Sequence, residues 1–169
     1  AHGDLMILAS YLSLAFITWL GLSPYWSFIA VVPAMYLVGY FFQRSLLNRV
    51  LGKEMDPSLI VAFGASIILQ NLLLLLFTPD ARALSTDLGF KTIHVSGDLR
   101  IPVNYLMDFL ISLAVIFFLY SFFQRSYLGR AIRAASDDEV AARLMGVNTK
   151  IIYAHAMGIA SMTAGVAGI

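Results

Sequence analysis

The sequence predicts an all-α, polytopic bundle of transmembrane helices. Hydrophobic residues make up 60% of the 169 residues, charged residues make up only 12%, and the mean hydropathy is +0.82. Average soluble domains hold about 45–50% apolar and about 25% charged residues. A single domain of this size cannot bury the excess, because small domains keep much of their surface exposed. We therefore expect the chain to lie in a lipid bilayer and not to be a soluble enzyme.

Five apolar stretches are each long enough to cross a bilayer as a helix, which takes about 20 residues with a range of about 17–25. These stretches are 5–22, 25–42, 57–77, 105–123 and 151–169. Asp56 followed by Pro57 is typical of a helix N-terminus. Asn104 and Asn148 stand where the fourth and fifth helices need N-caps. The sequence thus predicts one transmembrane domain over residues 1–169, with about five spans.

The Lys and Arg residues predict the orientation of these spans. Eight of the eleven lie in the predicted loops 43–56 and 124–150, and the other three lie in loop 78–104. Cytoplasmic loops of membrane proteins carry an excess of Lys and Arg. We therefore expect loops 43–56 and 124–150 to be cytoplasmic and loop 78–104 to be extracytoplasmic. Within loop 78–104, alternating residues around a Gly turn predict a small β-hairpin over residues 91–103, either a docking element or a solvated connector.

Several functional classes are excluded by composition. A net charge of +1 without a clustered basic patch argues against nucleic-acid binding. The chain has no cysteine, and therefore no disulfide, iron–sulfur cluster or thiolate zinc site. His155 has no second ligand at metal spacing, and a hydrogen-bonded packing role explains it. Gly52-Lys53 lacks the remaining residues of a phosphate-binding loop. We expect no cofactor, no metal, no catalytic residue and no bound nucleotide.

Within loop 124–150, the residues from Ser136 onward predict a short capped helix. Ser136 and Glu139 fit a capping box, and Gly146 fits the glycine that follows a helix C-terminus. One face of this helix carries Val140, Ala141, Leu144 and Met145. Because so short a helix is unstable alone, this face must pack against something. Two interpretations stay open: packing on the protein's own helices or the lipid interface, and docking of a cytoplasmic partner.

Polar residues inside the apolar stretches are the next candidates, since such residues are costly in hydrocarbon. Gln70 and Asn71 lie deep in stretch 57–77, where they either join helices by hydrogen bonds or contact a substrate. His2-Gly3-Asp4 precedes the first stretch. It is either an ordinary interfacial cap or an unwound segment suited to a substrate site.

Small residues recur every four positions in the last stretch. Ala156, Ala160, Ala164 and Gly168 form one stripe, and Ser161 and Gly165 form a parallel one. Such stripes allow helices to approach closely. The pattern predicts helix packing, within the chain or at a subunit interface, and carries no chemistry.

Several segments resemble the permease subunits of bacterial ABC transporters for branched-chain amino acids. They are Leu-Gly-Arg-Ala-Ile-Arg-Ala at 128–134, Ala-Ala-Arg-Leu-Met-Gly-Val-Asn at 141–148, Ala-Gly-Val-Ala-Gly at 164–168, the opening residues 1–6, and Ile-Leu-Gln-Asn-Leu at 68–72. Since family members are longer at both ends, we expect an interior fragment of such a permease. The resemblance implies a multi-pass protein of the bacterial inner membrane. It also implies separate cytoplasmic ATPase subunits, a second permease subunit and a periplasmic substrate-binding protein.

The resemblance also implies roles for particular residues. The cytoplasmic loop is similar to the Glu-Ala-Ala…Gly motif that couples such permeases to the ATPase. Here Val140 stands where the motif has Glu, and Glu139 lies one residue early. The implied coupling residues are Ser136, Glu139, Ala141, Ala142, Arg143 and Gly146. The candidates for the substrate path are His2, Gly3, Asp4, Gln70 and Asn71.

Two alternatives to an importer subunit stay open on the sequence. The first is a structural or assembly subunit that transports nothing. The second is a membrane-embedded enzyme, which needs clustered acid–base or nucleophilic side chains. His2, Asp4, Asp108 and His155 are too scattered along the predicted spans to favour it.

Overall fold

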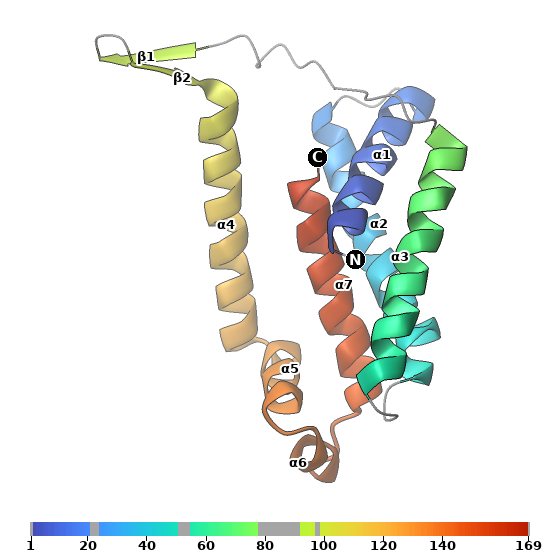
Figure 1. Cartoon of the computed structure of the whole chain (residues 1–169). Coiled ribbons are helices and arrows are strands. Elements are labelled where there is room, and N and C mark those ends of the chain that lie inside the picture. The colour runs from blue at the N-terminus through green and yellow to red at the C-terminus, as the bar shows by residue number, and fades with distance from the viewer. Residues whose placement is uncertain (1, 21–23, 51–54, 78–91, 97–98, 169) are drawn as a thin grey trace. The chain divides into compact units, whose positions relative to one another are not determined.

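The computed structural model describes residues 2–20, 24–50, 55–77, 92–96 and 99–168 (Figure 1). Each predicted stretch is helical over nearly all of its described residues. The five long helices are α1 (His2–Leu20), α2 (Pro24–Ser45), α3 (Met55–Phe77), α4 (Val103–Arg125) and α7 (Thr149–Ala167). The fold is therefore the predicted all-α helical bundle. By length and composition, three segments of the described chain qualify as membrane spans, namely Ile29–Arg49, Leu59–Leu76 and Tyr105–Arg125. The count of five spans remains a prediction.

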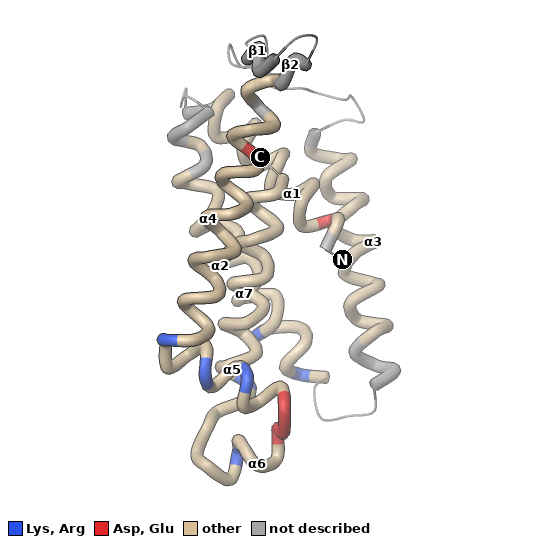
Figure 2. The backbone as a smooth tube through the Cα atoms, turned by 90° about the vertical axis from the view of Figure 1, so that its left-hand side faces the viewer, with Lys and Arg blue, Asp and Glu red and all other residues tan. Residues whose placement is uncertain are grey.

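The chain divides into two compact units. One unit contains residues 1–81 and 134–169, and the other contains residues 82–133. The first unit holds α1, α2, α3, α7, the short helix η1 (Leu47–Arg49) and α6 (Glu139–Leu144). In Figure 2, the Lys and Arg residues of α2, η1 and α7 lie where α2 ends and α7 begins. That this end of the bundle is cytoplasmic stays a prediction.

The core of the first unit is small-residue packing between α2 and α7. Gly39 on α2 faces Ser161 and the Met157 carbonyl on α7, and Gly165 faces the Met35 side chain. Leu5, Ala9, Val31 and Met35 are buried together where α1 joins this pair. The predicted small-residue packing is therefore confirmed, and it operates within the chain. Gly residues let the two backbones approach closely because they carry no Cβ atom.

Two polar contacts add to the packing between these helices. Ser13 on α1 and Ser27 on α2 are buried, with their hydroxyl oxygens 2.8 Å apart. The Tyr36 hydroxyl lies 2.5 Å from Nδ1 of His155 on α7. His155 is thus a hydrogen-bonded packing residue, as the sequence predicted. In lipid such bonds satisfy groups that water does not reach.

The second unit holds β1 (Thr92–Ser96), β2 (Leu99–Pro102), α4 and most of α5 (Tyr127–Asp137). The strands are antiparallel, with Ile93 opposite Ile101, which confirms the predicted hairpin. Pro102 is the N-cap of α4, so the predicted cap at Asn104 is wrong. The helix begins at once after Pro102, which leaves Asn104 inside the first turn. Proline suits the edge of a helix because it has no backbone N–H to pair.

Candidate coupling and substrate-path sites

The helix predicted from Ser136 begins later than expected. Ser136 lies within α5, and the N-cap of α6 is Asp138, whose Oδ1 accepts a hydrogen bond from the Ala141 N–H at 2.9 Å. The predicted capping box of Ser136 and Glu139 is therefore wrong. The physical reason is that α5 continues to Asp137, while Asp138 takes an extended backbone and caps as well as serine does.

α6 ends at Leu144, with Met145 as its C-cap, and Gly146 follows as the predicted glycine. Gly146 has a φ of 83°, in the left-handed region that favours glycine. The Gly146 N–H donates to the Arg143 carbonyl at 3.0 Å, and the Val147 N–H donates to the Ala142 carbonyl at 3.0 Å. These two bonds form a Schellman motif, which satisfies the last carbonyls of the helix and turns the chain away.

A polar network attaches α6 to the first residue of α7. Arg143 forms an ion pair with Glu139, and its Nε donates to Oγ1 of Thr149 at 3.0 Å. The Thr149 hydroxyl in turn donates to Oε1 of Glu139 at 3.3 Å. Thr149 is buried, and Asn148 caps α7, as predicted, by accepting from the Ile151 N–H at 3.4 Å. Glu139 therefore bonds forward toward α7 and not back to a cap.

The apolar face of α6 is open to its surroundings. Val140, Leu144 and Met145 are 68%, 83% and 84% exposed, whereas Ala142 on the other side is 5% exposed. A cap at each end and an ion pair thus stabilise the short helix α6, and three of its apolar side chains are exposed. Exposed apolar patches of this kind usually mark an interaction surface. The protein's own described helices therefore do not cover this face, while the lipid interface and docking of a partner both stay open.

A second polar cluster joins α1 to α3. Asp4 on α1 is only 7% exposed, and its Oδ1 accepts a hydrogen bond from Nε2 of Gln70 at 2.6 Å. The Ser66 hydroxyl donates to the other carboxylate oxygen. Sequence reasoning missed Ser66, although its spacing of four residues from Gln70 places both on one face of α3. Gln70 therefore does join helices, as one of its two interpretations predicted.

The other path candidates are placed differently. α1 begins at His2, so Gly3 and Asp4 are helical, and the unwound segment predicted there is wrong. Regular backbone hydrogen bonding costs less in lipid than an unwound segment does. Asn71 is exposed, and its Nδ2 donates to the Ile67 carbonyl of its own helix at 2.8 Å. The structure thus brings Asp4 and Gln70 together and leaves Asn71 outside the cluster.

An apolar cavity of about 410 Å³ lies beside the Asp4 carboxylate. Its walls come from α1, α2, α3 and α7 and include Leu8, Val38, Phe42 and Leu69. Asp4 and Ser66 are polar residues of its lining. Binding sites for small molecules are typically apolar pockets of about 300–1,000 Å³ with a few polar groups. This cavity offers apolar walls next to one carboxylate.

Comparison with known proteins identifies the relatives of this chain. Residues 1–169 match the family described as "Branched-chain amino acid transport system / permease component". The chain is 29% identical to the high-affinity branched-chain amino acid transport system permease protein BraD of Pseudomonas aeruginosa, with all of this chain and 59% of that protein covered. It is 28% identical to the permease protein LivH of Salmonella typhimurium and 27% identical to LivH of Escherichia coli K12, with all of this chain and 58% of each covered. The chain thus spans a little under three fifths of these relatives, and no solved structure matches it.

Proposed function

Since the chain belongs to the family of permease components of branched-chain amino acid transport systems, we propose that it forms part of the membrane-spanning subunit of an ABC importer. The substrates are branched-chain or related hydrophobic amino acids, carried across the bacterial inner membrane. The family match over residues 1–169 is the observation that carries this proposal. In a strain that lacks the full-length gene, we expect leucine uptake to fall and to return on complementation. Unchanged uptake in that strain would favour the assembly-subunit alternative.

ATP hydrolysis belongs, in this proposal, to separate cytoplasmic ATPase subunits that dock on α6. The support is the exposed face of Val140, Leu144 and Met145 on a helix held at both ends. The bonds among Glu139, Arg143 and Thr149 connect α6 to α7. A displacement of α6 is therefore transmitted to α7 and, through the packing at Gly39, to α2. Ser136 and Ala141 are also exposed, while Ala142 is buried on the opposite side of α6 and supports the helix from below. Gly146 fixes the angle at which the chain leaves α6.

The Asp4 cluster and its cavity form, in this proposal, part of the substrate path. An amino acid presents an ammonium group, which a carboxylate attracts, next to an apolar side chain, which an apolar wall accepts. Asp4 supplies the carboxylate, while Leu8 and Leu69 belong to the apolar wall. Gln70 and Ser66 hold the Asp4 side chain in place. His2 and Gly3 begin the same helix, and Asn71 is the remaining path candidate, on α3 but outside this cluster.

We expect Gln70→Leu and Asn71→Leu to cause different defects. Gln70→Leu removes a bond between helices, which is typically worth about 0.6 kcal/mol and at most about 2 kcal/mol in membranes, so the amount of assembled permease falls. Asn71→Leu removes a bond within one helix, so abundance stays normal while uptake per molecule falls. The measurement is uptake of labelled leucine divided by the amount of full-length permease. Normal uptake per molecule in Asn71→Leu would remove Asn71 from the path.

The remaining partners follow from the family. We propose that a second permease subunit completes the path and that a periplasmic binding protein delivers substrate on the side of the β1–β2 hairpin. This arrangement requires loops 78–104 and 124–150 to lie on opposite sides of the inner membrane. The uneven division of Lys and Arg supports that topology.

Cysteine labelling tests the topology. We expect an impermeant thiol reagent to label Ser96→Cys in intact cells and to label Ser136→Cys only after the cells are broken. Ser136 is exposed on α5, so its accessibility does not limit the second reaction. Because the chain has no cysteine of its own, residues 1–169 contribute no background. Labelling of both variants in intact cells would show that the number of spans between them is even.

A further inference from the structure

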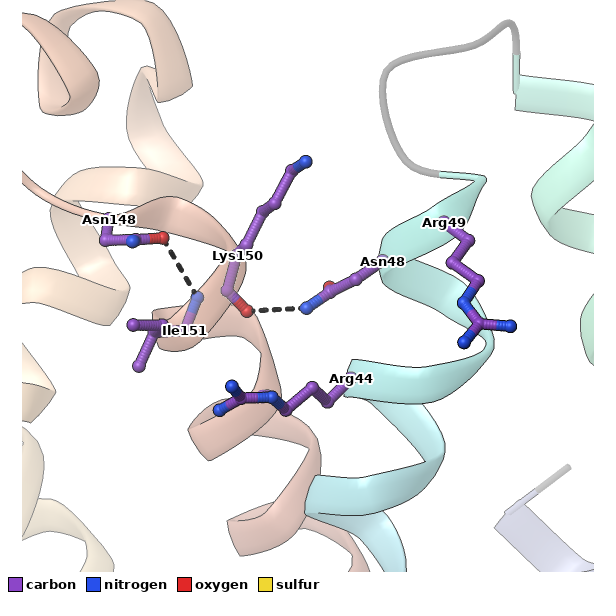
Figure 3. A pocket seen from close by; sticks show the side chains of 7 residues that line it. Arg44, Asn48, Arg49, Asn148, Lys150 and Ile151 are labelled. Carbon is purple, nitrogen blue, oxygen red and sulfur yellow. Dashed lines mark hydrogen bonds between the residues drawn. The ribbon is translucent and has the colours of Figure 1, made fainter.

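A basic pocket of about 390 Å³ lies where α2 and η1 meet the start of α7 (Figure 3). Three cationic side chains line it, from Arg44, Arg49 and Lys150, together with the amides of Asn48 and Asn148. Among the described residues that line it there is no Asp or Glu. We propose that this pocket binds the phosphate of an anionic glycerophospholipid headgroup, such as that of phosphatidylglycerol.

Hydrogen bonds hold the two walls of the pocket together. Nδ2 of Asn48 donates to the Lys150 carbonyl at 2.9 Å, which joins η1 to the first turn of α7. Oδ1 of Asn48 accepts from Nε2 of the buried Gln43 at 3.2 Å, so both ends of this amide are fixed. Figure 3 shows the side chains of Arg44 and Lys150 on opposite sides of the bond between Asn48 and Lys150. The pocket is therefore a built feature with cations on both sides of a fixed link.

The cationic side chains of the pocket can attract an anion. Within the described residues, the ion pair that forms is Arg143 with Glu139 on α6, and it uses none of the pocket cations. Nη1 of Arg44 donates to the Tyr40 hydroxyl at 2.8 Å, a neutral partner that orients the guanidinium. Several cations without a carboxylate create a positive potential that attracts anions.

The position of the pocket at the end of a candidate span favours a lipid phosphate as the anion. The candidate span Ile29–Arg49 ends here, and Lys150 stands in the first turn of α7. Ile151 and Ala154 complete the lining, and Ala154 lies one turn deeper along α7 than Lys150. The cations would contact the anionic headgroup at the membrane surface, and the apolar residues below them would contact the glycerol and acyl chains. Basic pockets between transmembrane helices on the cytoplasmic side bind anionic headgroups in this way.

The test is native mass spectrometry of the full-length permease in detergent, with phosphatidylglycerol or phosphatidylcholine titrated in. We expect phosphatidylglycerol to remain bound and phosphatidylcholine to dissociate. Arg44→Gln and Lys150→Gln should each weaken phosphatidylglycerol binding about fivefold, since one cation near an anionic surface contributes roughly 1 kcal/mol. Lys150→Arg keeps the charge and should retain binding. Arg133→Gln, an exposed cation on α5 outside the pocket, is the matched control and should change nothing.

Inorganic phosphate, added as a competitor, distinguishes a pocket that binds a lipid phosphate from one that binds free phosphate. Under the proposal, phosphatidylglycerol stays bound in its presence, because the apolar floor contributes to lipid binding alone. Displacement of the lipid by inorganic phosphate would overturn the lipid assignment. Equal retention of the two lipids, or equal loss of binding in Arg133→Gln and Lys150→Gln, would also overturn it.

Discussion

Replacing Gly146 with valine is expected to separate the permease from its ATPase while leaving the permease in the membrane. Gly146 has a φ of 83°, and a left-handed residue with a Cβ costs roughly 1–2 kcal/mol. The bonds of Gly146 and Val147 to α6 then strain or break, which turns the face of Val140 and Leu144 out of register. We expect co-purification of the ATPase with the full-length permease to fall about tenfold, the factor that about 1.4 kcal/mol represents.

Gly146→Asn is the matched control, because asparagine tolerates the left-handed conformation better than other residues with a side chain. No Cβ clash explains a defect at this site, since nothing lies within 4 Å of a Cβ built on Gly146. The backbone conformation alone is therefore under test. Full co-purification and full uptake in Gly146→Val would contradict a coupling helix that ends at this residue.

Gly39→Val is expected to disrupt the packing of α2 against α7. A Cβ at position 39 lies 2.6 Å from the Met157 carbonyl oxygen and clashes with the Ser161 side chain. The Met157 oxygen belongs to the backbone, so α7 itself must move. Overpacking of this kind costs typically about 1–3 kcal/mol. The measurement is the midpoint temperature for loss of the monodisperse full-length permease in detergent, which we expect to fall by several degrees.

Gly64→Val is the control for that experiment. Gly64 lies within α3, and nothing lies within 4 Å of a Cβ built there. The intrinsic change from glycine to valine in a helix is the same at both positions. We expect Gly64→Val to leave the midpoint nearly unchanged. Equal midpoints for the two variants would show that α2 and α7 do not depend on this close approach.

The positions of the long helices follow from the sequence. A helix that crosses a bilayer needs about 20 consecutive apolar residues, and such long apolar stretches are rare in other structures. Helix ends are less determined. Residues Ser136, Asp137 and Asp138 are all good N-caps, and nothing local shows that Asp138 is used. α5 was missed although Leu128, Ala131, Ile132 and Ala135 recur at helical spacing, which was a usable signal.

The candidate sites show a similar division. Gly146 was predictable because a left-handed C-terminal residue is a local requirement. The bond between Asp4 and Gln70 joins residues 66 positions apart, and no local pattern indicates which helices meet. Asp4 and Gln70 were both selected as polar residues near or within apolar stretches, but their pairing needed the packing of α1 against α3. The pocket at Arg44 and Lys150 likewise forms only when α2 and α7 pack together.

ATP-dependent uptake of leucine into liposomes tests whether separate ATPase subunits drive this permease. The liposomes hold the full-length permease with its second permease and ATPase subunits, and the binding protein and labelled leucine are added outside. With ATP enclosed, we expect leucine accumulation that ADP does not support and that Gly146→Val lowers about tenfold. Uptake that is the same with ATP and with ADP, or that Gly146→Val leaves intact, would contradict a permease driven by ATPases through α6.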